Sequence, residues 1–126
     1  MTQTVLVVDD DRDCTSALAE LLRSESFSVQ CASDGEQALA QIEGELPDVV
    51  LTDIRMPGMD GYELLRRVRE RFPCVRVVLM SAEGELPSRS LREGAHGYVA
   101  KPLELDDVVQ AIRAALESAR PPKEAG

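Results

Sequence analysis

Acidic, hydroxyl and ammonium side chains stand at the ends of several short apolar runs in this sequence. They are Asp9, Asp10, Asp53, Ser81 and Lys101. Three carboxylates brought together repel one another unless a cation lies among them, and oxygen ligands favour a hard ion such as Mg²⁺. A hydroxyl and an ammonium on the opposite side suit the oxygens of a phosphoryl group. The residue types therefore indicate metal-assisted phosphoryl chemistry, provided that the fold brings them together.

Apolar runs rich in β-branched residues alternate with segments whose apolar residues recur at helical spacing. Strands are expected at residues 5–8, 28–32, 48–52, 74–80 and 97–99. Helices are expected from residue 14, over 35–44, over 64–72, over 87–93 and over 105–116. This βα unit repeated five times, with nearly continuous apolar strands, predicts a doubly wound α/β fold with a parallel sheet covered on both faces.

Parallel α/β sheets bind their ligands outside the carboxyl ends of the strands, where the five polar residues should meet. Asp53 follows the third strand and takes the central position among them. A carboxylate oxygen can attack phosphorus and form an aspartyl phosphate, a mixed anhydride that water readily hydrolyses. Asp53 is therefore the candidate nucleophile.

Length and charge restrict the class of protein. The 126 residues fit one domain, which we expect over residues 1–117, with residues 118–126 as a disordered tail or truncated linker. A net charge of -9 opposes direct contact with nucleic acid. No apolar run approaches the roughly 20 residues of a membrane span, so a cytoplasmic location is expected.

Four segments together resemble the receiver domain of two-component response regulators. They are LVVDDD (6–11), TDIRMPGMDG (52–61), LMSA (79–82) and YVAKP (98–102). The resemblance covers about residues 5–116, with every signature position in order. It implies the flavodoxin-like strand order 2-1-3-4-5, which spacing alone does not give.

The resemblance also implies a metal site. By it, Asp53 is the phosphoacceptor, and Mg²⁺ is held by Asp10, Asp53 and the main-chain carbonyl of Arg55. Asp9 would reach the metal mainly through water.

The same resemblance assigns the residues on the phosphate side of the site. Ser81 and Lys101 would hold phosphoryl oxygens, and Ser81 and the strand-five aromatic Tyr98 would form the conformational switch. The bond between Lys101 and Pro102 would be cis. The phosphoryl donor would be a sensor histidine kinase or phosphotransfer protein, and the recipient of the signal a downstream output domain or protein. Such a module is a switch with self-catalysed phosphotransfer and autodephosphorylation, not a conventional enzyme, and its dimerisation stays open.

The chain departs from the family pattern before the fifth strand. Ser81 and Lys101 are 20 positions apart, fewer than is usual, and Pro87 lies where the fourth helix should form. We therefore predict a shortened or partly irregular fourth helix. Arg55 and Glu83 should line the rim of the pocket, and we expect them to form an ion pair that narrows the path of the attacking water, worth about 0–1 kcal/mol.

Two other functions are compatible with part of the pattern. A phosphohydrolase of the haloacid-dehalogenase type also uses Mg²⁺, an aspartate nucleophile, a hydroxyl residue and a lysine. It requires a second Asp two positions after the nucleophile, where this chain has Arg55. A receiver that serves only as a phosphorylation-independent interaction domain is disfavoured by the complete acidic set.

The remaining reactive residue types have simpler interpretations. Three widely spaced cysteines are expected to be reduced packing residues: Cys14, Cys31 and Cys74. His96, between two nearby glycines, is expected to be an exposed turn residue. Asp11 and Asp13 are expected at a helix start, and Met56 and Met59 are expected to shape the loop around Pro57.

Overall fold

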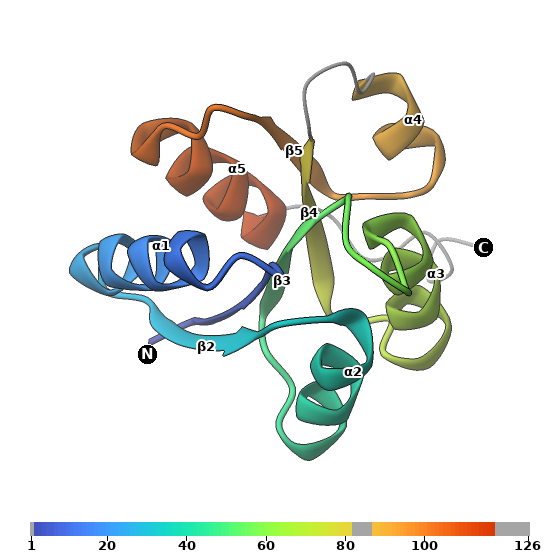
Figure 1. The fold of residues 1–126 in the computed structure, drawn as a ribbon. Helices are drawn as coiled ribbons and strands as arrows, with labels where there is room; N and C mark the ends of the chain where they lie inside the picture. The colour runs from blue at the N-terminus through green and yellow to red at the C-terminus, as the bar shows by residue number, and fades with distance from the viewer. Residues whose placement is uncertain (1, 82–86, 118–126) are drawn as a thin grey trace.

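Five parallel strands form one sheet in the structure, a computed structural model that describes residues 2–81 and 87–117 (Figure 1). The strands are β1 (Thr4–Val8), β2 (Ser28–Ala32), β3 (Val49–Asp53), β4 (Arg76–Ser81) and β5 (Gly97–Ala100). Their spatial order is β2-β1-β3-β4-β5. The predicted doubly wound fold and its strand order are therefore confirmed.

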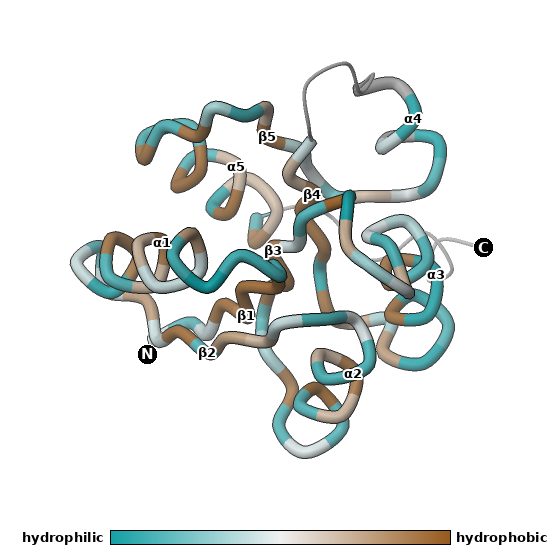
Figure 2. The backbone as a smooth tube through the Cα atoms, in the orientation of Figure 1, coloured by the Kyte–Doolittle hydropathy of each residue, from teal (hydrophilic) through white to brown (hydrophobic). Residues whose placement is uncertain are grey.

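Helices cover both faces of the sheet. They are α1 (Arg12–Ser24), α2 (Gly35–Gly44), α3 (Gly61–Arg71), α4 (Pro87–Arg92) and α5 (Leu105–Glu117). α1 and α5 pack on one face, while α2 and α3 pack on the other. Successive strand residues point to opposite faces of the sheet. Val5 and Val7 therefore belong to the core cluster under α1 and α5, and Leu6 and Val8 to the core cluster under α2 and α3. Figure 2 shows the resulting apolar interior between the helices and the sheet.

Three helices begin at an aspartate that follows a strand or loop. Asp11 accepts hydrogen bonds from the backbone N–H groups of Asp13 and Cys14 at the start of α1. Asp34 caps α2 and Asp60 caps α3 in the same way. Such caps satisfy backbone donors that the first helical turn leaves unpaired. The prediction that Asp11 and Asp13 belong to a helix start is confirmed.

Four of the five strands differ from the sequence prediction by one or two residues at an end. β4 begins at Arg76 and not at Cys74, because Val75 N–H donates to the carbonyl of Phe72 in a turn. β3 includes Asp53, which pairs with Met80 of β4. Asp53 is therefore held within the sheet and does not lie in the following loop.

The fourth helix is short, as predicted. α4 has 6 residues, whereas the other helices have 10 to 13. Gly94, with a φ of 95°, follows it and turns the chain back toward β5. The Lys101–Pro102 bond is cis, as expected. Among the described residues, no helix has the length and apolar character needed to cross a membrane.

Two packing predictions need correction. All three cysteines are free, but Cys31 and Cys74 are exposed and only Cys14 is partly buried. Cys31 lies near the end of the edge strand β2, on the same face as the buried Val29, and its side chain is nevertheless exposed. His96 is partly buried and hydrogen-bonded to β4, so its assignment as an exposed turn residue is wrong. Met56 and Met59 do pack beside the loop, in or against the core.

Candidate functional site

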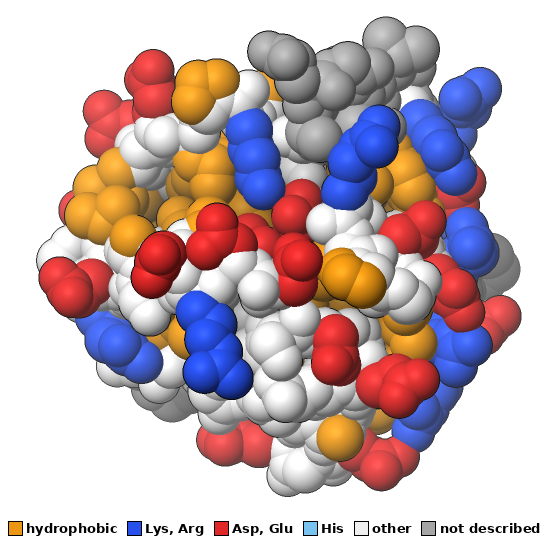
Figure 3. Space-filling model, viewed as in Figure 1, with side chains coloured by type: hydrophobic (Ala, Val, Ile, Leu, Met, Phe, Trp, Pro, Cys, Tyr) orange, Lys and Arg blue, Asp and Glu red, His pale blue; other side chains and the backbone are white. Residues whose placement is uncertain are grey.

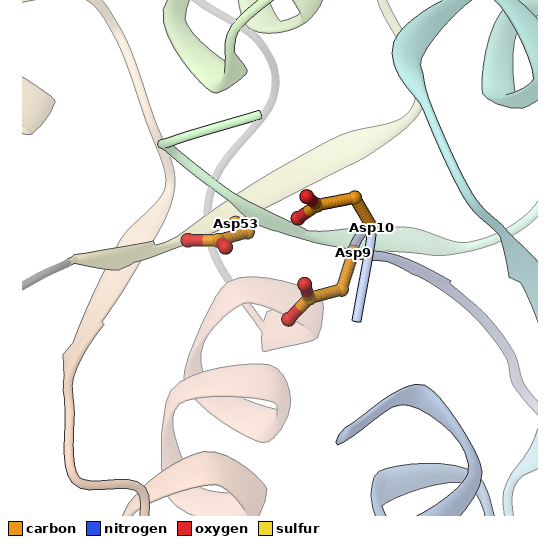
Figure 4. Close-up of side chains that lie close together, drawn as sticks. All are labelled: Asp9, Asp10 and Asp53. Carbon is orange, nitrogen blue, oxygen red and sulfur yellow. The ribbon is translucent and has the colours of Figure 1, made fainter. Parts of the chain in front are cut away.

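Three aspartates from two strand ends face one another at the carboxyl edge of the sheet. One carboxylate oxygen from each of Asp9, Asp10 and Asp53 lies within 4.8 Å of the others. Figure 4 shows the three side chains directed toward a common space from the ends of β1 and β3. On the surface in Figure 3, acidic side chains gather at the centre of this face, with Lys and Arg side chains next to them. The predicted meeting of these residues is therefore confirmed.

The pairing of neighbouring strands explains why the aspartates meet. β1 and β3 run in register with Val8 opposite Thr52, so the next residues, Asp9 and Asp53, lie side by side. Asp9 is 1% exposed and its backbone N–H donates to the carbonyl of Ala32, which ties it to β2 as well. The two carboxylates are thus fixed by the sheet itself.

Gly61, the first residue of α3, allows the chain to pack closely under Asp53. A Cβ at this position would lie 2.6 Å from the carbonyl oxygen of Asp53 and 2.7 Å from Cα of Ile54. Gly61 N–H also donates to the carbonyl of Ile54 at 2.8 Å. Only glycine fits this contact without moving the backbone that carries Asp53.

Lys101 brings a positive charge to the aspartates from the end of β5. Its Nζ lies 3.2 Å from Asp53 Oδ2 and 3.8 Å from Asp9 Oδ2. Burial disfavours the charged form of Lys101, but the carboxylates of Asp53 and Asp9 outweigh it and raise the lysine pKa. The ammonium group is therefore firmly protonated at neutral pH.

The pKa of Asp53 is nevertheless raised. Burial is the largest cause and the charge of Asp9 the next, and together they outweigh Lys101 and the backbone N–H of Arg55, which lower it. Asp9 Oδ2 and Asp53 Oδ1 are buried, and neither accepts a hydrogen bond. Buried acceptors without partners are costly, so the site carries more negative charge than one ammonium offsets. A divalent cation held by oxygen ligands fits this deficit.

The structure describes all but one of the other predicted site residues. Ser81 is buried at the end of β4, and its carbonyl accepts a hydrogen bond from Lys101 N–H at 3.2 Å. Tyr98 is partly buried on β5, opposite Leu79 of β4. Arg55 is exposed two residues after Asp53. Glu83 lies outside the described residues, so the proposed ion pair with Arg55 stays a prediction.

Two further residues contact the site without having been predicted. The Thr15 hydroxyl donates to the carbonyl of Asp11 at 2.8 Å and to that of Asp9 at 3.4 Å, which fixes the loop after β1. Burial and the neighbouring Asp9 raise the pKa of the Cys14 thiol to about 11. The contact of Thr15 could have been predicted from its spacing, because a Thr hydroxyl in a helix often donates a hydrogen bond to the carbonyl four residues before it, here that of Asp11.

Comparison with known proteins agrees with this geometry. Residues 5–113 match the family described as the response regulator receiver domain. The chain belongs to the response regulator receiver family. The haloacid-dehalogenase and phosphate-independent alternatives are accordingly not favoured.

Other receivers resemble this one over most of its length. It is 36% identical over 115 residues to sporulation initiation phosphotransferase F of Bacillus subtilis (strain 168), covering 90% of this chain and 93% of that protein. It is 34% identical over 119 residues to the C4-dicarboxylate transport transcriptional regulatory protein DctD of Rhizobium meliloti (strain 1021). That match covers 93% of this receiver but only 26% of DctD.

Solved receiver structures share the fold. A crystal structure of a putative response regulator from Chloroflexus aurantiacus J-10-fl superposes with a TM-score of 0.86 at 34% sequence identity. The match covers 94% of this chain and 100% of that one.

Proposed function

We propose that this receiver accepts a phosphoryl group on Asp53 from the phosphohistidine of a sensor histidine kinase or phosphotransfer protein. The observation that carries the proposal is the meeting of three carboxylates with Lys101, whose Nζ is 3.2 Å from Asp53. An anionic nucleophile, a cation beside it and a cluster suited to a divalent metal are the parts that phosphoryl transfer requires.

Mg²⁺ is the cofactor that this donor set fits. Asp10, Asp53 and the main-chain carbonyl of Arg55 would hold it directly, with Asp9 acting mainly through water. The two unpartnered carboxylate oxygens support this assignment. When bound, the ion supplies positive charge that offsets the charge of the carboxylates and of the phosphoryl oxygens.

The transfer step exchanges one bond to phosphorus for another. An Asp53 carboxylate oxygen forms a bond to phosphorus while the P–N bond of the phosphohistidine breaks. The electron pair of that bond leaves with the imidazole of the donor. The Lys101 ammonium and the Ser81 hydroxyl hold the phosphoryl oxygens during and after the transfer.

Loss of the phosphoryl group reverses the signal. A water oxygen attacks phosphorus, the bond to Asp53 breaks, and inorganic phosphate leaves. We expect Arg55 and Glu83 at the rim that this water crosses, where their ion pair would slow its approach. Autodephosphorylation and phosphotransfer are thus both self-catalysed, although the receiver is not a turnover enzyme.

The conformational signal passes from Ser81 to Tyr98. The phosphoryl group favours the state in which the Ser81 hydroxyl moves toward it and Tyr98 turns inward, which is a shift between two existing populations. The recipient is a downstream output domain or protein in the cytoplasm. The negatively charged receiver does not itself bind nucleic acid. A homodimer is compatible with phosphoryl transfer and with the conformational switch.

Acetyl phosphate tests the proposal directly. With Mg²⁺, intact mass spectrometry should detect the gain of one phosphoryl group, and Asp53→Asn should abolish it. Asp13→Asn is the matched control, because Asp13 lies in α1 outside the cluster and should leave uptake unchanged. Rapid turnover of assorted phosphate esters would favour a phosphohydrolase instead. Absence of uptake, together with no response to beryllofluoride, would favour an interaction domain without phosphorylation.

A further inference from the structure

A second pocket lies beside the aspartate site, between the loop after β3 and helix α4. It has a volume of about 550 Å³ and is lined by residues 54–57, Asp60, Tyr62 and Arg89. Small-molecule sites usually have volumes of roughly 300–1,000 Å³. The pocket is therefore large enough for a small organic ligand, and Arg55 is the one lining residue to which we also assign a part in phosphoryl transfer.

The buried part of the lining is apolar. Ile54, Met56 and Tyr62 are 3%, 8% and 2% exposed, and Pro57 stands beside them in the loop. Methionine sulfur and the flat face of proline suit an aromatic ring. Tyr62 also carries a buried hydroxyl that has no hydrogen-bond partner. The buried lining, which forms the floor of the pocket, is thus apolar, apart from the Tyr62 hydroxyl, which has no hydrogen-bond partner.

A positive charge stands over this floor. The guanidinium carbon of Arg89 lies 3.9 Å from the centroid of the Tyr62 ring. Arg89 Nε lies 4.0 Å from a carboxylate oxygen of Glu93, and the two side chains are 50% and 28% exposed. A pair at that distance contributes little, so the Arg89 guanidinium group can still donate hydrogen bonds to another anion.

Among the described residues of the lining, Asp60 is the one carboxylate, and it caps a helix. Asp60 caps α3 by accepting a hydrogen bond from the backbone N–H of Glu63 at 2.9 Å. Over the part of its lining that the structure describes, the pocket therefore combines an apolar floor with two arginines, Arg55 and Arg89, against one helix-capping carboxylate. This combination selects for a ligand with a flat apolar body and a single negative group.

We propose that this pocket binds small aromatic carboxylates. The ring lies against Met56 and Pro57, next to the Tyr62 ring that Arg89 covers, and the carboxylate accepts hydrogen bonds from the Arg89 guanidinium group. The bound ligand would join the β3–α3 loop to the short helix α4. The proposal does not depend on phosphorylation at Asp53.

Sodium benzoate is the probe for a titration followed by NMR on the methyl groups of Ile54 and Met56. Benzoate should shift both signals in a saturable manner. Acetate, which lacks the ring, should leave them in place, and benzyl alcohol, which lacks the charge, should bind about tenfold more weakly, the equivalent of one charge-assisted hydrogen bond.

Variants of α4 supply the matched comparison. Arg89→Gln should weaken benzoate binding about tenfold. Arg92→Gln removes an exposed arginine of the same helix that does not line the pocket, and should have no effect. Arg89→Lys keeps the charge, and retained binding in this variant would exclude loss of folding as the cause. The absence of saturable shifts, equal shifts with acetate, or equal weakening by Arg89→Gln and Arg92→Gln would overturn the proposal.

Discussion

Lys101 Nζ lies 3.2 Å from Asp53 Oδ2, although their strands, β5 and β3, are separated by β4. The lysine therefore crosses the end of the intervening strand to reach its partner. Its side chain is 33% exposed, whereas that of Asp53 is 7% exposed. One ammonium group at the mouth of the site thus faces two buried carboxylates, since Asp9 is 3.8 Å away.

Replacing Lys101 should slow phosphorylation more than it affects folding. Lys101→Met removes the cation that would hold a phosphoryl oxygen, and loss of one such donor typically costs about a hundredfold in rate. The rate of acetyl phosphate uptake at saturating Mg²⁺ measures this effect. Lys101→Arg keeps the charge and should be less impaired. Equal uptake by the Met variant and the unmodified protein would exclude this role for Lys101.

Mg²⁺ should stabilise the folded protein through the acidic cluster. A ligand at about 100 times its dissociation constant adds about 2.7 kcal/mol to the free energy of unfolding. Thermal unfolding with and without Mg²⁺ should show this gain in the unmodified protein and lose it in Asp10→Asn. Asp13→Asn, outside the cluster, should retain it. A gain of the same size in Asp10→Asn would argue against a metal in the cluster.

Gly61 should be intolerant of any side chain. Gly61→Ala places a Cβ 2.6 Å from the Asp53 carbonyl oxygen, so the backbone must shift. Overpacking of this kind costs roughly 1–3 kcal/mol, and denaturant unfolding should show it. The displaced Asp53 should also accept phosphate more slowly.

Gly44 provides the control for that substitution. It ends α2, and a Cβ there would meet nothing within 4 Å. Gly44→Ala should be neutral or stabilise the protein by up to about 1 kcal/mol, because alanine favours the helix. If both variants lost the same stability, close packing under Asp53 would not be the cause.

Much of the site was predictable because it depends on topology. Parallel strands end at one edge of a sheet, so any residues that follow them must meet there. Asp9, Asp53 and Lys101 obey this rule without any need for detailed packing. The strand order could not be predicted in this way, because several strand orders have the same alternation of strands and helices along the chain. It came from the resemblance to receivers.

What sequence could not predict depends on contacts between distant elements. Cys31 lies on the same face of the edge strand β2 as the buried Val29, and yet it is exposed. Arg89 and Tyr62 are 27 positions apart in ordinary helical segments, and only the packing of α4 on α3 stacks them. His96 has glycines nearby on both sides, as an exposed turn residue often does, yet it is hydrogen-bonded to Val77 of β4.

His96 joins the start of β5 to β4 through two hydrogen bonds with Val77. Its backbone N–H donates to the Val77 carbonyl at 2.8 Å, and its Nδ1 accepts from the Val77 N–H at 3.3 Å. Nδ1 can accept only when it carries no proton. Burial lowers the pKa of His96, and the charges of Arg76 and Arg69 lower it further.

Acid should therefore weaken the fold through His96. Because its folded pKa lies below the unfolded value of 6.5, the unfolded chain binds more protons, and stability falls as the pH drops below about 6.5. Protonation would also break the bond to Val77, worth about 0.5–1.5 kcal/mol. Denaturant unfolding between neutral and acidic pH measures the loss.

His96→Asn isolates the contribution of this histidine. The asparagine carbonyl oxygen occupies a place similar to that of Nδ1 and can accept from Val77 N–H, but it does not titrate. The variant should match the unmodified protein near neutral pH and lose less stability in acid. Asp53 has a raised pKa, which gives stability the opposite pH dependence. Both proteins contain Asp53, so its contribution cancels when the stability of the variant is subtracted from that of the unmodified protein at each pH. Parallel stability curves for the two proteins would show that His96 does not take up its proton on unfolding.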